Sequence, residues 1–98
     1  KYNIFVANFG HAGDGNIHVN FMCNREDADS IARARLCVSE TFQLSVALGG
    51  TISGEHGIGY VKAPYMDYAI DKPTLEIMKG IKKVFDPNGI LNPGKMFV

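Results

Sequence analysis

The sequence has 98 residues, of which 46% are hydrophobic and 20% are charged, a composition typical of one small globular domain. Ten Lys and Arg residues balance ten Asp and Glu residues, so the net charge does not favour nucleic acid or an anionic membrane surface as a partner. No apolar run approaches the roughly 20 residues that a membrane-spanning helix needs, which predicts that the chain has no membrane span.

The first part of the sequence predicts two strands joined by a glycine-rich turn. Residues 2–9 are rich in β-branched and aromatic types and end at Gly10, which predicts a buried strand. Residues 16–21 alternate between apolar and polar side chains, as a second strand would. The polar side carries Asn16, His18 and Asn20. A strand face in contact with solvent alone normally carries charge, so we interpret this polar face as the wall of a cleft.

Two main helices are predicted after the strands. Residues 27–48 have apolar side chains at three- and four-residue spacing, with Asp27 as the N-cap and two glycines, residues 49–50, as the stop. The stripe consists of Ile31, Ala34, Val38, Phe42, Ser45 and Leu48. The second helix is predicted to start near Pro73 and to end at the turn formed by residues 86–89. One face of it carries Leu75, Met78, Ile81 and Phe85. Residues 60–70 favour a short helix or a loop.

This order of elements predicts an α+β fold, with a small antiparallel sheet and two main helices. Two or three strands leave open sheet edges, so we expect further chain or a second copy to cover them. The sequence starts at Lys1 without an initiating methionine and soon enters an apolar run at residues 4–7, which predicts that it is a fragment of a longer protein. Cys23 and Cys37 lack a CxxC pattern, which favours free thiols in a reducing compartment over one disulfide.

All three histidines lie in two glycine-rich phrases, and the first of these is residues 11–18. The glycines and the aspartate between His11 and His18 favour a tight turn over a helix, so the two imidazoles can converge from neighbouring strands and hold a divalent metal. Asp14 would fix the turn or orient a histidine. The alternatives are a turn in which the histidines cap backbone groups, and a phosphate-binding loop, which would need a Lys-Ser/Thr pair that is absent here.

The second glycine-rich phrase, residues 53–59, places Glu55 and His56 side by side. Neighbours in an extended segment point to opposite sides, so we expect only one of the two to bind the metal. Glu55 would complete a His, His, Glu set with open positions for substrate or water, and His56 would be free as a general base. The alternatives are a loop with a solvated Glu-His pair, a metallohydrolase with the same ligands, and a binding or self-association module without chemistry.

Three motifs in a fixed order give the sequence a family resemblance. They are HAGDGNIHVN at residues 11–20, GEHGIG at residues 54–59 and FDPNGILNPGK at residues 85–95. Together they resemble the C-terminal part of the FAD-linked oxidase family, which includes D-lactate dehydrogenases, the glycolate oxidase FAD-binding subunit and D-2-hydroxyglutarate dehydrogenases. The resemblance covers residues 3–97, nearly the whole chain.

The resemblance implies a role for seven residues. The metal ligands would be His11, His18 and Glu55. The other positions are His56 as the base that removes the substrate hydroxyl proton, Asn20 as a substrate contact, and Asn92 and Lys95 as contacts near the flavin. The two imidazoles and one carboxylate favour zinc or manganese, with iron and cobalt as alternatives.

The resemblance also implies an activity for the parent enzyme. It would use FAD to oxidise a small D-2-hydroxy acid to the 2-oxo acid, with the FAD held mainly by an N-terminal domain that this sequence lacks. Residues 1–98 would form one C-terminal fragment of a ferredoxin-like substrate domain, inactive alone. Its partners would be the substrate, the rest of the flavoenzyme chain and, as a homo-oligomer, a second copy. The location would be cytoplasmic, including the periphery of the inner membrane, or mitochondrial in a eukaryote.

Overall fold

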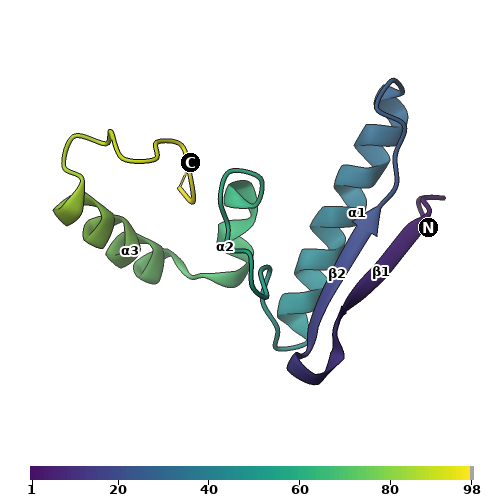
Figure 1. Cartoon of the computed structure of the whole chain (residues 1–98), viewed down its shortest axis with the longest axis horizontal. Helices are drawn as coiled ribbons and strands as arrows, with labels where there is room; N and C mark the ends of the chain where they lie inside the picture. The colour runs from purple at the N-terminus through teal and green to yellow at the C-terminus, as the bar shows by residue number, and fades with distance from the viewer. Residues whose placement is uncertain (98) are drawn as a thin grey trace.

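The computed structural model describes residues 1–97 and has the α+β architecture that the sequence predicts. A two-stranded antiparallel sheet is followed by one long helix, a short helix and a third helix. Figure 1 shows α1 along the β1–β2 hairpin, with α2, α3 and the C-terminal tail extending away from it. The elements are β1 (Val6–His11), η1 (Ala12–Asp14), β2 (Asn16–Phe21), α1 (Ala28–Ala47), η2 (Ala63–Tyr65), α2 (Met66–Ala69) and α3 (Lys72–Phe85).

The hairpin is held in register by its tight turn. His11 pairs with Asn16, and Phe9 pairs with His18, so these four side chains share one face of the sheet. Gly15 has a φ of 67°, the left-handed conformation that lets the chain reverse direction. At Gly10 a Cβ atom would lie 2.2 Å from the carbonyl oxygen of Asn16, so only glycine permits this approach of the strands.

The first strand differs from its prediction in bounds and in burial. It begins at Val6, four residues later than predicted, and it continues past Gly10 to His11. It is also not buried, because Val6 and Phe9 are 40% and 64% exposed. An apolar strand is fully buried only where other elements cover both faces of its sheet. Among the residues that the structure describes, a helix lies against only one face of the hairpin (Figure 1).

Capping fixes the first long helix as the sequence predicts. The Asp27 carboxylate accepts a hydrogen bond of 3.0 Å from the backbone N–H of Asp29, which satisfies a free donor of the first turn. Gly49, with a φ of 85°, reverses the chain just after the helix. One predicted stripe residue is misplaced: Leu48 lies beyond the helix and is 78% exposed.

The later helices also follow the sequence. In residues 60–70 the short-helix alternative is confirmed by η2 and α2. The Asp71 carboxylate caps α3 by accepting a hydrogen bond of 2.9 Å from the Thr74 N–H, with Pro73 in the first turn. The predicted apolar face of α3 is only partly covered, since Ile81 and Phe85 are 56% and 78% exposed.

The apolar core is small and lies between α1 and the segment that contains α2. Its buried members are Ala34, Ile52, Ala63 and Met66. The radius of gyration is 15.6 Å, whereas a compact chain of this length has about 13 Å. The described residues therefore form an open arrangement with much apolar surface exposed. Within residues 1–97, none of the helices combines the length and apolar character that a membrane crossing requires.

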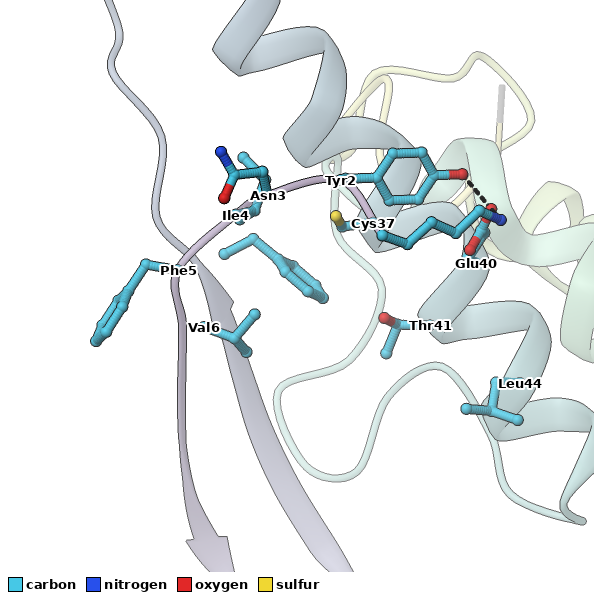
Figure 2. Close-up of a pocket in the computed structure, with 11 residues that line it drawn as sticks. Tyr2, Asn3, Ile4, Phe5, Val6, Cys37, Glu40, Thr41 and Leu44 are labelled. Atoms are coloured by element: carbon cyan, nitrogen blue, oxygen red, sulfur yellow. Dashed lines mark hydrogen bonds and ion pairs between the residues drawn. The ribbon is translucent and has the colours of Figure 1, made fainter.

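The N-terminal segment borders a hollow of about 800 Å³ against α1 (Figure 2). Arg33 ties the segment down by donating two hydrogen bonds of 3.0 Å, to the carbonyls of Tyr2 and Asn3. The Tyr2 hydroxyl and the Lys1 ammonium both donate to the Glu40 carboxylate, and these hydrogen bonds lower the pKa of Glu40. None of the seven predicted site residues lines this hollow.

Candidate metal and acid-base site

The carboxylate of Glu55 is the centre of a cluster of imidazoles near the turn of the hairpin. Its Oε1 atom lies 2.9 Å from His18 Nε2, 3.6 Å from His11 Nε2 and 3.8 Å from His56 Nε2. The same oxygen accepts a hydrogen bond of 2.9 Å from the amide of Asn16. The two glycine-rich phrases thus meet at one point, as the sequence predicts.

Two separate parts of the chain bring these groups together. The strand pairing of His11 with Asn16 places both residues on one face of the hairpin, and His18 follows two residues later on the same face. Glu55 comes from the loop after α1, which is anchored by the buried Ile52. This loop passes so close to β2 that a Cβ atom on Gly54 would lie 2.2 Å from Asn16 Oδ1.

The donor set and its spacing fit a divalent metal ion. One nitrogen from each of His11 and His18 and one oxygen from Glu55 all lie within 4.8 Å of one another. Ligands at about 2.1 Å from a tetrahedral zinc ion are about 3.4 Å apart, and the distances of 2.9 and 3.6 Å from Glu55 Oε1 bracket that value. Three protein ligands at a half-exposed place leave open coordination positions, as a catalytic metal site requires.

The electrostatics of the cluster favour an ionised Glu55. Partial burial acts to raise its pKa, but the hydrogen bonds from Asn16 and His18 and the nearby His11 and His56 outweigh that effect, and the pKa is lowered. The ring of His18 is stacked on Phe9, with the centroids 4.8 Å apart, and its side chain is 25% exposed. A charged acceptor beside an oriented imidazole is an arrangement that can hold a cation.

The position of His56 corrects one step of the sequence argument. Glu55 and His56 were expected to point to opposite sides, yet His56 Nε2 lies within 3.8 Å of the Glu55 carboxylate and its ring centroid is 5.3 Å from that of His18. The loop turns sharply here, because Gly57 has a φ of 77° and its carbonyl accepts a hydrogen bond from Ser53. At 74% exposure, the His56 side chain is the most accessible of the three imidazoles.

The other three predicted site residues lie outside the Glu55 cluster, one on the hairpin and two in the C-terminal tail. Asn20 is on the sheet face of His18, and its amide donates a long hydrogen bond of 3.4 Å to the carbonyl of Ala7. Asn92 and Lys95 lie in the exposed tail after α3. That tail is joined to the site loop by a hydrogen bond of 2.6 Å from the Met96 N–H to the carbonyl of Gly59, three residues after His56.

Sequence reasoning missed two contributors to this site. Asn16 was recognised on the polar face of β2 but received no role, although it is the neutral donor that holds Glu55. Its place two residues before His18 on that face was the available signal. Gly54 lies in the second glycine-rich phrase, and its close approach to Asn16 depends on tertiary packing that no local pattern encodes.

One family model and several characterised proteins are similar to this chain. The family model described as "FAD linked oxidases, C-terminal domain" matches residues 1–96. The chain is 46% identical to glycolate oxidase subunit GlcD of Bacillus subtilis over 99% of its length, and 42% identical to a D-lactate dehydrogenase of Anaerostipes hadrus over 93%. It is 45% identical to the D-2-hydroxyglutarate dehydrogenase of Stutzerimonas stutzeri over 91%. It covers 21%, 19% and 20% of these three relatives.

Proposed function

The chain belongs to the C-terminal domain family of the FAD-linked oxidases, and we propose that it supplies the metal ligands and the general base of a flavoenzyme that oxidises a small D-2-hydroxy acid to the 2-oxo acid. One observation carries this proposal: the ligand atoms of His11, His18 and Glu55 converge within 4.8 Å, with His56 beside them. The names of the relatives support the substrate class, because glycolate, lactate and 2-hydroxyglutarate are all 2-hydroxy acids.

The residues of this chain would divide the work between binding and proton transfer. His11, His18 and Glu55 hold zinc or manganese. When bound, the metal lowers the pKa of the substrate hydroxyl, and the flavin supplies the hydride acceptor. His56, the exposed imidazole at the cluster, accepts the hydroxyl proton. Asn20 is one step along the same sheet face from His18, where its amide can hold the substrate.

Exposed apolar surfaces on the hairpin and on α3 support the proposal that the rest of the enzyme packs against this chain. The hairpin residues Phe9 and Ile17 are 64% and 66% exposed, and on α3 Val84 and Phe85 are 77% and 78% exposed. Apolar faces of this kind normally lie against other protein. The relatives are about five times longer than this chain, so we propose that the remainder of the enzyme packs here and carries the FAD, with Asn92 and Lys95 facing it.

Metal analysis of the full-length enzyme tests the proposal. We expect one equivalent of zinc or manganese in the wild type, and loss of that metal in His18→Ala, because one of three protein ligands is removed. His56→Ala is the matched control, since it removes an imidazole of the same cluster that is assigned to proton transfer, and it should keep the metal. Equal metal in all three proteins would contradict the ligand set. A parent protein without flavin absorbance would favour the metallohydrolase instead.

A further inference from the structure

The C-terminal tail is ordered by polar anchors and not by apolar burial. All residues from 87 to 95 are exposed, including Ile90 at 73% and Leu91 at 57%. Apolar contacts therefore contribute little to fixing this segment. In Figure 1 the tail leaves the end of α3 and returns as a long arch toward α2.

The anchor at the start of the tail is the carboxylate of Asp86, at the C-terminal end of α3. The side chain of Asp86 is 3% exposed, and its two oxygens accept hydrogen bonds of 3.0 Å from the backbone N–H groups of Ile90 and Leu91. Lys82, one helical turn earlier, pairs with the same carboxylate. Its ammonium also donates a hydrogen bond of 2.8 Å to the carbonyl of Leu91.

Lys82 and Asp86 thus form hydrogen bonds with both N–H and C=O groups of the tail backbone. A buried carboxylate is stable only when it is paired and hydrogen-bonded, and these contacts with the tail meet that need. The hydrogen bond from Lys82 also lowers the pKa of Asp86, with smaller contributions of the same sign from the Ile90 and Leu91 N–H groups. Order in the tail and ionisation of Asp86 therefore depend on each other.

The far end of the tail is anchored to the loop that carries Glu55 and His56. The Met96 N–H donates to the carbonyl of Gly59, which lies three residues after His56 in the same loop. Two glycines of that loop, Gly57 and Gly59, have φ values of 77° and 57°, so the loop backbone has little intrinsic stiffness. A contact that immobilises Gly59 therefore restricts where the His56 imidazole can lie.

We propose that Lys82 and Asp86 are positioning residues for the site: they fix the tail, and the tail in turn holds the loop that carries Glu55 and His56. The inference rests on the proposed function for its effect on turnover, but its mechanical part stands on the described contacts alone. It also accounts for the placement of Asn92 and Lys95, which lie between the two anchors.

Hydrogen–deuterium exchange on the full-length enzyme tests the mechanical part. Asp86→Asn and Lys82→Met should each speed amide exchange roughly 10-fold or more, both in residues 86–97 and in residues 53–62. Lys82→Arg should restore slow exchange, because a guanidinium can contact both the carboxylate and the Leu91 carbonyl. Lys79→Met is the matched control: Lys79 is on the same helix and pairs with the exposed Glu76 at 3.3 Å, and within residues 1–97 it makes no hydrogen bond to the tail.

Steady-state kinetics on the same variants tests the catalytic part. Displacement of a catalytic group by about 1 Å costs roughly 100-fold, so kcat should fall by about 10- to 100-fold in Asp86→Asn, with metal and FAD content retained. The proposal is overturned if exchange rises in residues 86–97 while residues 53–62 and kcat stay at wild-type values. If Asp86→Asn does not fold, Lys82→Met decides, because it keeps the Asp86 hydrogen bonds to the tail. If the enzyme does not oxidise hydroxy acids, only the proposed function fails, since the exchange result still reports on the contacts of Lys82 and Asp86 with the tail.

Discussion

His18 Nε2 lies 2.9 Å from Glu55 Oε1, although the two residues are 37 positions apart in the sequence. The contact joins the second strand of the hairpin to the loop after α1. It is part of a cluster in which one carboxylate faces three imidazoles, and most of the proposed chemistry depends on it.

Replacing His56 should impair proton transfer without removing the metal. In the full-length enzyme, His56→Ala should lower kcat by roughly 100- to 10,000-fold, which is the usual contribution of a general base. Stopped-flow measurement of flavin reduction by the substrate would isolate this step. Normal turnover in this variant would remove His56 from the base role.

Asn16 should support metal binding through its hydrogen bond to Glu55. Asn16→Ala removes the donor that lies 2.9 Å from Glu55 Oε1, and loss of such a supporting contact costs about 10- to 100-fold in metal affinity. Titration with a competing chelator would measure this change. Asn20→Ala is the comparison, because Asn20 is on the same face without that bond: it should raise KM for the hydroxy acid and leave metal affinity unchanged.

A methyl group at Gly54 should push the Glu55 loop away from β2. The new Cβ would lie 2.2 Å from Asn16 Oδ1, and relief of such an overlap costs about 1–3 kcal/mol. Gly54→Ala should therefore lower metal affinity and the thermal stability of the metal-loaded enzyme. Gly80→Ala is the control. Gly80 lies in α3, where an added Cβ atom would meet no neighbouring atom within 4 Å, and alanine should stabilise the helix by about 0.5–1 kcal/mol. Equal metal affinities for both variants would argue against the close approach.

Acid should release the tail from its anchor at Asp86. The hydrogen bond from Lys82 holds the pKa of Asp86 below the ordinary Asp value of about 3.9. A group whose folded-state pKa is lowered contributes its full stability above the unfolded value, and that contribution is lost as the pH falls through the folded value. The protection factors of the amides in residues 86–97 of the full-length enzyme, which correct for the intrinsic pH dependence of exchange, should therefore fall below about pH 4. In Asp86→Asn the exchange should already be fast and should lack this pH step.

The local elements could be predicted from the sequence because short-range chemistry determines them. The alternation of apolar and polar residues defined β2, and Asp27 and Gly49 marked the ends of α1. A glycine-rich turn implied the hairpin that places His11 and His18 on one face of the sheet. These features depend on dihedral preferences and capping within a few residues. The glycine-rich phrase at residues 53–59 pointed to Glu55 and His56 for the same reason, since it too is contiguous in the chain.

Three features were decided only by the tertiary structure. The side of Glu55 on which His56 lies follows from a left-handed glycine turn, whose direction a glycine-rich sequence leaves open. The role of Asn16 and the anchor of the tail at Gly59 follow from contacts between residues far apart in the sequence. Burial of β1 and of the α3 face could not be read from their apolar patterns, because burial depends on what packs against an element, whereas the pattern records only which side can be buried.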